Sequence, residues 1–341
     1  MECQRRIDLW CDIGLALSGN KILVRAVKSF FYFSIIYLGF AVIVASIYMD
    51  GNMTGLAAVS ISAKALLTVG EYFLIGIFAG IIILTLLVDR EMLHRRAMPI
   101  AYALVATVLT QAGFTLLKNT MSFITPYFAD PFFANLDHAL HFGMDPWMIA
   151  HWLGNYLPTK AMTYSYLTVW GLPALTLPAI IAATDVNRVR AKRTLVLYLV
   201  AWIFIGNVLA LSGLSVGPVY YDRLLGGDRF ADLMMALQTS GVSDSHIGRV
   251  QQALWDIYTG RSASIGSGIS AFPSVHVAIA SVTAIYMVER SKWLLPLAAA
   301  FLFFTFFLSV YTGYHYAVDG YASILVVFAV WWVMRRKFAA E

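Results

Sequence analysis

The amino-acid sequence predicts an all-α protein, built as a polytopic membrane helix bundle. Of its 341 residues, 60% are hydrophobic and only 13% are charged. Several segments run for about 20 residues almost without charge, which is the length that a helix needs to cross the ~30 Å hydrocarbon core of a bilayer. The net charge of +5 does not indicate nucleic-acid binding, because the basic residues fall into short clusters between the apolar segments.

Eight apolar segments are predicted to be transmembrane helices, at about residues 29–49, 71–88, 98–117, 161–183, 194–213, 274–288, 293–311 and 315–334. The predicted parts of the chain are an N-terminal amphipathic segment with two accessory helices (1–97), a six-helix core (98–334) and a basic tail (335–341). Two long connections, 118–160 and 214–273, are expected to act as lids or binding loops. The second carries short amphipathic patterns near 228–239 and 246–259.

The distribution of basic residues predicts the orientation in the membrane. Most of the 24 Lys and Arg residues lie in the N-terminal segment, in the second, fourth and sixth connections and in the tail. The positive-inside rule makes these parts cytoplasmic, so both termini are expected to be cytoplasmic. The two long connections then face the periplasm, the cell exterior or an organelle lumen. Cys3 and Cys11 precede the first span and are expected to stay reduced.

Two short motifs flank the sixth and seventh spans. Residues 271–276 read AFPSVH, and residues 310–319 read VYTGYHYAVD. Because the two spans between them would form a hairpin, His276 and His315 are expected at the same outer face. Asp319 lies one helical turn after His315, so its carboxylate can reach a ring nitrogen of that histidine. Two imidazoles and a carboxylate at the same depth in the membrane predict an active site.

The residues around His276 predict a helix start at the depth of lipid phosphates. Pro273 and Ser274 are typical of the first turn and the N-cap of a helix. The span that follows has about 16 residues, or ~24 Å, which is shorter than the hydrocarbon core. Free backbone N–H groups at a helix start form a natural anion site. For His276 alone, a packing or pore-lining histidine is an equally good interpretation.

Asp319 strengthens the case for His315. A carboxylate bound to one imidazole nitrogen fixes the tautomer and raises the basicity of the other nitrogen. A charged residue within a membrane span is costly and usually functional. The alternative is that Asp319 only accepts a hydrogen bond from a buried histidine and has no part in a reaction.

The motifs Phe-Pro-Ser-Val-His and Val-Tyr-x-Gly-x-His-Tyr-x-x-Asp resemble the second and third signatures of the type-2 phosphatidic acid phosphatase superfamily. The resemblance covers residues 98–334 and implies an integral membrane enzyme with a six-helix core. By that resemblance, His315 is the nucleophile that forms a phosphohistidine, Asp319 orients it, and His276 is the general acid. The resemblance implies phosphoryl transfer on a lipid without a metal or other cofactor.

Some residues depart from the usual phosphatase signatures. Ser309 stands where those phosphatases usually carry Arg, and Val275 stands where they usually carry Gly. A segment reading GPVYYDR at 217–223 takes the place of the first signature, and together with 137–146 it resembles the inositol phosphorylceramide synthase and sphingomyelin synthase branch. That branch moves a phospho-headgroup from a phospholipid to an alcohol. The candidate substrate-binding residues are Arg223, which would neutralise phosphate charge, and Ser274, Tyr221, Tyr311, Lys118 and Asp137.

The expected function is a lipid phosphotransferase, with membrane lipids as donor and acceptor and inositol phosphate as one possible headgroup. A lipid phosphate phosphatase would use the same histidines with water as acceptor. A proton-coupled transporter, with histidines that relay protons, is the alternative from another class. His138 and His141 have a spacing that metal sites use, but no third ligand motif accompanies them, so no metal is predicted. The sequence makes no prediction of oligomeric state.

Overall fold

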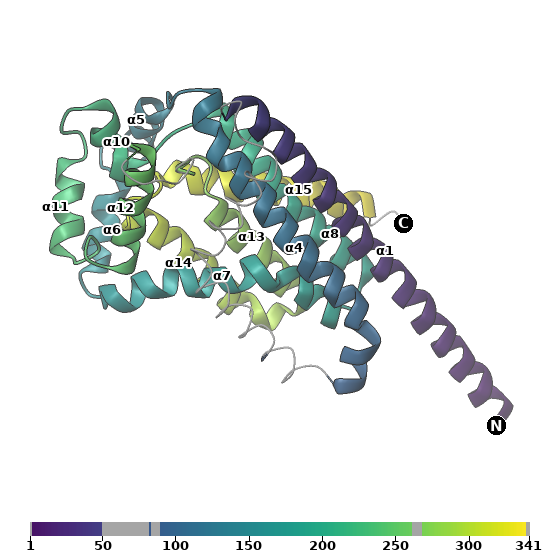
Figure 1. Cartoon of the computed structure of the whole chain (residues 1–341). Helices are drawn as coiled ribbons and strands as arrows, with labels where there is room; N and C mark the ends of the chain where they lie inside the picture. The colour runs from purple at the N-terminus through teal and green to yellow at the C-terminus, as the bar shows by residue number, and fades with distance from the viewer. Residues whose placement is uncertain (1, 50–81, 83–88, 261–267, 339–341) are drawn as a thin grey trace.

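The computed structural model describes residues 2–49, 82, 89–260 and 268–338, with side chains from residue 23 onward. All regular structure in these residues is helical, which confirms the all-α prediction. Long helices form a bundle, and short helices gather at one end of it (Figure 1). The long helices are α1 (Glu2–Tyr48), α4 (Arg90–Ile124), α7 (Thr159–Thr184), α8 (Arg188–Leu199), α13 (Val275–Arg290), α14 (Leu295–Tyr311) and α15 (Ala317–Phe338).

Within the described residues, six helical stretches are long and apolar enough to cross a membrane, which supports an integral membrane protein: Leu23–Tyr48, Arg90–Ile124, Thr159–Thr184, Arg188–Ser212, Lys292–Tyr311 and Ala317–Lys337. The fourth combines α8 with the π-helix η1 (Val200–Leu209) and α9 (Ala210–Ser212), and the fifth includes the 3-10 helix η2 (Lys292–Leu294). The predicted span 71–88 lies almost wholly outside the described residues. The predicted span 274–288 corresponds to α13, which has 16 residues. The count of eight therefore stays a prediction.

Helix α1 packs along α4 through small and polar side chains. A Cβ atom added at Gly113 of α4 would lie 2.8 Å from the Tyr37 ring, so only glycine lets this ring pack so closely. The Tyr37 hydroxyl donates to the side-chain oxygen of Asn207 in η1, and the hydroxyls of Ser34 and Thr110 lie 2.9 Å apart. Away from water, such polar groups must be satisfied within the protein. These contacts therefore join α1 to the rest of the bundle.

The π-helix η1 packs closely against α4 and the start of α13. A Cβ atom at Gly206 would lie 2.6 Å from the Phe114 ring and 2.9 Å from a Val275 methyl group. Neither neighbour can move far in a packed interior. Glycine at this position therefore allows the close approach that fixes the start of α13, next to His276.

Buried charges fix the opposite end of α13. The Asp185 carboxylate is fully buried and accepts hydrogen bonds of 2.9 and 2.7 Å from Arg190. Glu289, near the C-terminus of α13, accepts a 2.6 Å hydrogen bond from Arg193 and another of 2.6 Å from Trp331. A buried charge is tolerated only when it is paired. These pairs join α13 to α8 and α15 at the end far from His276.

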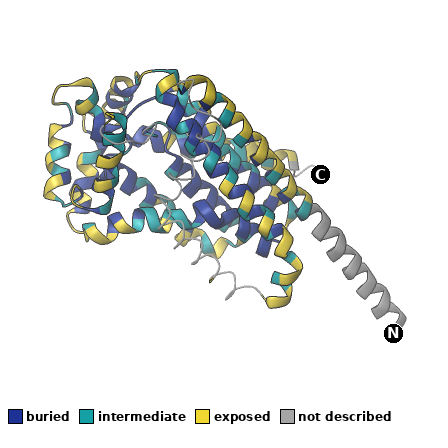
Figure 2. Cartoon of the chain, viewed as in Figure 1, coloured by how far each residue is buried: buried dark blue, intermediate teal, exposed yellow. Residues whose placement is uncertain are grey.

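The helical cap consists of α5 (Asp130–Leu140), α6 (Pro146–Gly154), α10 (Pro218–Leu225), α11 (Ala231–Thr239) and α12 (His246–Tyr258). It is formed by the two long connections, and α11 and α12 match the predicted amphipathic patterns. The cap helices are buried on their inner sides and exposed on their outer sides (Figure 2). They cover the end of the bundle at which α15 begins, since α5 contacts α15.

Candidate functional site

His276 lies in the first turn of α13, where aromatic rings hold its imidazole. Ser274 caps the helix, because its hydroxyl accepts a hydrogen bond from the Val277 N–H at 3.4 Å. The His276 ring centroid lies 5.1 Å from that of Tyr166 and 4.2 Å from that of Trp170. The Trp170 indole N–H also donates to the His276 carbonyl at 3.0 Å. No described side chain is hydrogen-bonded to the His276 ring.

His315 lies in the tight turn between α14 and α15. Gly313 adopts a φ of 70°, a conformation that glycine reaches without strain. The Nδ1 atom of His315 lies 3.3 Å from Oδ2 of Asp319, and this oxygen also accepts the Tyr316 N–H at 3.0 Å. Asp319 is fully buried. In the tautomer that carries its proton on Nδ1, facing the carboxylate, the lone pair lies on Nε2, the nitrogen that can attack an electrophile.

The structure brings the two imidazoles together. The ring centroids of His276 and His315 lie 5.8 Å apart, with an interplanar angle of 66°. The backbone fixes this separation, because the Ser274 N–H donates to the Asp319 carbonyl at 3.2 Å. The Ser323 hydroxyl in turn donates to the Ser274 carbonyl at 2.8 Å. Ser274, predicted to bind substrate, thus lies beside the site and joins the start of α13 to α15.

Asp137 lies in the cap helix α5 and binds the backbone at the start of α15. Its two carboxylate oxygens accept the backbone N–H groups of Ala317 at 2.8 Å and Val318 at 2.9 Å. These are among the N–H groups that a helix start leaves without an intrahelical partner. Both oxygens of this predicted substrate-binding residue are therefore occupied by backbone, two and three residues after His315.

Asp130, at the start of the cap helix α5, also binds backbone N–H groups through its carboxylate. It accepts the backbone N–H groups of Val216 at 2.8 Å and Gly217 at 2.9 Å. It also accepts the Tyr316 hydroxyl at 3.0 Å. Asp130 was missed from the sequence, although it lies seven residues before Asp137 in a short amphipathic helix, a spacing that puts both on one face.

Lys118 lies near the C-terminal end of α4, close to both histidines. Its charge interacts electrostatically with His276 and with His315. Its Nζ atom lies 5.7 Å from the centroid of the Phe114 ring. No residue in the described part of the chain forms an ion pair or hydrogen bond with it. The structure thus brings this predicted substrate-binding residue to the imidazole pair.

Arg223 does not lie beside the imidazole pair. Its side chain is exposed, and its guanidinium donates to the Gln252 side chain at 3.1 Å and lies 5.9 Å from the Trp255 ring centroid. It therefore does not stand in for the arginine that Ser309 replaces. Ser309 itself is buried and donates to the Phe306 carbonyl at 2.7 Å.

The two predicted tyrosines also lie apart from the imidazole pair. Tyr311 is fully buried, and its ring stacks on His151 with centroids 4.4 Å apart. Its carbonyl accepts a 2.9 Å hydrogen bond from Nε2 of His151, which indicates a packing role between α14 and α6. Tyr221 is half-buried in the cap, with its ring 5.2 Å from that of Phe230.

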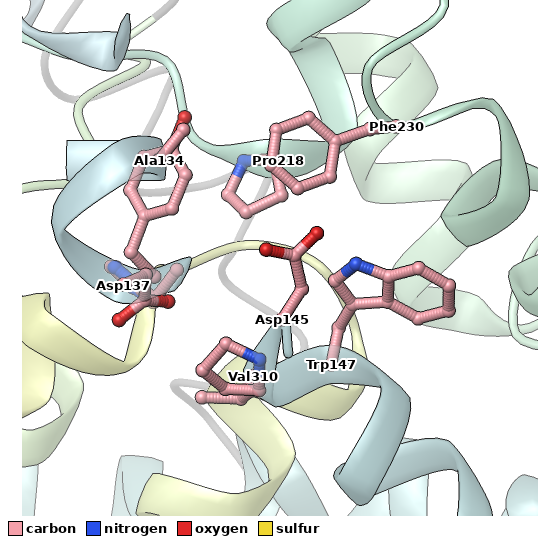
Figure 3. A pocket seen from close by; sticks show the side chains of 10 residues that line it. Ala134, Asp137, Asp145, Trp147, Pro218, Phe230 and Val310 are labelled. Carbon is pink, nitrogen blue, oxygen red and sulfur yellow. The ribbon is translucent and has the colours of Figure 1, made fainter. Parts of the chain in front are cut away.

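A small cavity of about 10 Å³, enough for one water molecule, separates His315 from the cap. Figure 3 shows Asp145 and Trp147 side by side at its edge. The Trp147 indole nitrogen is buried without a hydrogen-bond partner. Asp145 accepts hydrogen bonds of 2.5 and 2.7 Å from Arg229. The lining residues are Ala134, Asp137, Asp145, Pro146, Trp147, Pro218, Phe230, Val310, His315 and Tyr316.

The ion pair at this cavity joins two cap segments. Burial disfavours the charged form of Asp145, but the hydrogen bonds from Arg229 and His138 outweigh it, so the pKa of Asp145 lies below its ordinary value. His138 contributes through its Nδ1 atom, 3.0 Å from the carboxylate. The charge of Arg229 is thus matched by Asp145 and does not act as a free cation.

The histidines with metal-like spacing have protein partners instead. Nδ1 of His141 lies 2.7 Å from the Asp137 carbonyl and its Nε2 lies 3.0 Å from the Tyr321 hydroxyl. His138 contacts Asp145, as described above. Among the described residues, no group of three or more His, Cys, Asp or Glu side chains is arranged to hold a metal ion.

Comparison with family models gives one match, to the PAP2 superfamily over residues 131–333. The searches of curated proteins and of solved structures each find no match. The matched region includes His276, His315 and Asp319, and it spans more than half of the chain. The geometry of this site and the family match lead to the same conclusion: the chain belongs to the PAP2 superfamily, whose members are phosphatases and phosphotransferases.

Proposed function

We propose that this protein is an integral membrane lipid phosphotransferase that moves a phospho-headgroup from a phospholipid to an alcohol through a phosphohistidine. The observation that carries the proposal is the pair of imidazoles with ring centroids 5.8 Å apart, one of them backed by the buried Asp319. Reacting atoms in a productive complex lie about 3 to 3.5 Å apart. A separation of this size supports the action of both imidazoles on one phosphate group.

The first step transfers the phosphoryl group to the protein. Nε2 of His315 attacks phosphorus, and the bond from phosphorus to the lipid oxygen breaks. His276 enters this step protonated and gives its proton to the leaving oxygen, so diacylglycerol departs as a neutral alcohol. Asp319 stabilises the positive charge that develops on His315.

The second step regenerates the protein. His276, now neutral, takes the proton of the acceptor hydroxyl while that oxygen attacks phosphorus. The N–P bond to His315 breaks, and the phosphodiester product leaves. The same residue thus acts as acid and then as base, as microscopic reversibility requires.

The helical cap and the missing phosphatase signature support transfer to an alcohol. A transferase must keep water from the phosphohistidine, and the cap covers this end of the bundle. The serine at position 309 and the GPVYYDR segment support the inositol phosphorylceramide synthase and sphingomyelin synthase branch. A lipid phosphate phosphatase is the second candidate, because the cavity beside His315 has room for a single water molecule.

The proposed orientation places the site at the outer face. The basic connections support a cytoplasmic position for both termini, and the site lies at the opposite end of α13 from Glu289 and Arg290. The donor and acceptor would then both be lipids or alcohols that reach the outer leaflet.

The test uses the full chain in nanodiscs with headgroup-labelled phosphatidylinositol, with and without ceramide as the acceptor alcohol. Mass spectrometry is expected to find a new labelled lipid that depends on the acceptor, and His315→Ala should lower its rate by about 10⁴-fold or more. His94→Ala is the matched control, since His94 is exposed near the other end of α4. Released headgroup phosphate without a new lipid would favour the phosphatase, and full activity of His315→Ala would refute both.

A further inference from the structure

The cap helix α6 carries its apolar side chains on its outer side. Its inner side is formed by Ala150, His151 and Gly154, which are buried against the protein. A surface helix in water has the opposite pattern, with its apolar stripe inward and its polar and charged side chains outward. The outer side chains of α6 are Met148, Ile149, Trp152 and Leu153, all of them exposed.

The apolar surface of α6 extends to the start of α7 without a charge. Residues 146–159 contain no Asp, Glu, Lys or Arg. Asp145, just before them, is buried and paired with Arg229. Tyr156 and Leu157, just after the helix, are exposed and add to its apolar outer side. Large apolar patches of this kind mark surfaces that bind a membrane or another protein.

The packing of α6 places it at the level where two membrane spans end. Its inner side lies against the ring of Tyr311, on which His151 stacks with centroids 4.4 Å apart. Tyr311 is the last residue of one candidate span, and Thr159 is the first residue of another. Their side-chain hydroxyls lie 3.3 Å apart. Helix α6 therefore lies at the boundary between headgroups and acyl chains, where Trp and Tyr are enriched.

The neighbouring elements indicate that lipid covers this surface. Helix α7, which follows α6, exposes the apolar side chains of Tyr164 and Val169, and α14, on which α6 packs, exposes Phe303. Such side chains on a membrane span face acyl chains, and the outer side of α6 continues their surface. The outer sides of α11 and α12 and the turns beside them are polar instead, with exposed Asp228, Asp232, Gln238, Asp244, Arg249 and Gln252.

We propose that α6 and residues 155–157 are inserted into the lipid bilayer, where they bind the acyl chains of the leaflet at this end of the bundle. Helices α11 and α12 lie in water, so the cap is half immersed. The first residues of α6, Pro146 and Trp147, line the cavity beside His315. Helix α6 therefore stands between this cavity and the lipid. The inference concerns a lipid-binding surface and holds whichever reaction the histidines perform.

The experiment measures membrane depth with a nitroxide on a single cysteine, in the full chain with Cys3→Ser and Cys11→Ser in phosphatidylcholine nanodiscs. Met148→Cys on α6 is compared with Met235→Cys on α11, because both methionines are exposed, at 47% and 60%. Oxygen concentrates among acyl chains, whereas a nickel chelate stays in water. The ratio of oxygen to nickel collisions should be at least about 5-fold higher at 148, since an interfacial helix buries its apolar face about 5 to 10 Å deep.

Two results would overturn the inference. Equal collision ratios at positions 148 and 235 would place α6 in water. Low collision rates with both reagents at 148 would show that a second copy of the chain or another protein covers α6. Phe303→Cys on α14 is the reference for a lipid-facing position, because this side chain is exposed within a candidate span.

A second readout needs no substitution. The unmodified chain is placed in nanodiscs whose phosphatidylcholine carries a photoreactive diazirine on its acyl chain, and cross-linked peptides are identified by mass spectrometry. Cross-links are expected within residues 146–157 and on the exposed side of α14, and not on α11 or α12. Cross-links on α14 without any in residues 146–157 would contradict the inference.

Discussion

The Asp319 carboxylate is held in an unusual way for a buried charge. Its Oδ2 atom meets Nδ1 of His315 and the Tyr316 N–H, but its Oδ1 atom is buried without a hydrogen-bond partner. A carboxylate with an unsatisfied oxygen in a low-dielectric site gains more from a neighbouring positive charge than a solvated one does. In the proposed mechanism, Asp319 would stabilise His315 as its phosphorylated, positively charged form develops.

Asp319→Asn is expected to lower kcat by about 10² to 10⁴-fold, because the neutral amide neither fixes the tautomer of His315 nor stabilises its charge. The substitution should leave the fold intact, since the bond between α13 and α15 uses the main-chain carbonyl of Asp319. Turnover measured in nanodiscs beside a thermal unfolding curve checks this. An unchanged kcat in a folded protein would show that Asp319 has no role beyond packing.

Sequence reasoning at the residue scale identified the histidine pair and missed what surrounds it. His276 and His315 could be predicted because two consecutive apolar spans form a hairpin that returns the chain to the same side. Arg223 could not be excluded, because an arginine on a short amphipathic helix has the same pattern whether it faces the site or solvent. The direction of the Lys118 side chain could not be predicted either. A lysine near the end of a span can extend toward the membrane surface or turn into the bundle, and the packing of the neighbouring helices determines which of the two occurs.

At the scale of elements, α5 connects the cap to the turn that carries His315. Asp137 holds the first N–H groups of α15, and Asp130 holds the turn at Val216 and Gly217. Sequence patterns predicted amphipathic segments near 228–239 and 246–259, and α11 and α12 confirm them. The role of α5 could not be predicted, because its carboxylates bind backbone that lies far away in the sequence and carries no side-chain signature.

Asp137→Ala is expected to destabilise the protein by about 1 to 3 kcal/mol, since it removes a helix cap and leaves two buried N–H groups without acceptors. Chemical denaturation followed by circular dichroism measures the change. Asp232→Ala is the matched control, because Asp232 is exposed in the first turn of α11, and it should change stability by less than about 0.5 kcal/mol. Equal stability of the two variants would contradict this role of Asp137.

At the scale of the whole molecule, the bundle has two unlike ends. The end with the cap carries the imidazole pair, and the other end carries the ion pairs of Asp185 and Glu289. Hydropathy predicted the long helices well, but α13, at 16 residues, is shorter than the six candidate spans. A short helix beside longer ones starts below the level of its neighbours. This placement agrees with the prediction that His276 lies near the depth of lipid phosphates, below the cap.

The proposed orientation predicts which end can be labelled from outside. In a chain with Cys3→Ser and Cys11→Ser, a membrane-impermeant maleimide should label Phe142→Cys in intact cells, and Trp293→Cys only after lysis. Both positions are highly exposed, at 100% and 93%. Phe142 lies in the turn after α5, and Trp293 lies in η2 at the opposite end of the bundle. The reverse pattern would place the site on the cytoplasmic side.

The central claim is that His276 and His315 act on one phosphorus atom, with His315 as the nucleophile. Rapid alkaline quenching of the protein with phospholipid donor and no acceptor, followed by peptide mass spectrometry, tests it most directly. We expect a phosphorylated His315 that disappears when an acceptor alcohol is added and is absent from His315→Ala. Phosphate on another residue, or rapid turnover that never passes through a phosphohistidine, would contradict the mechanism.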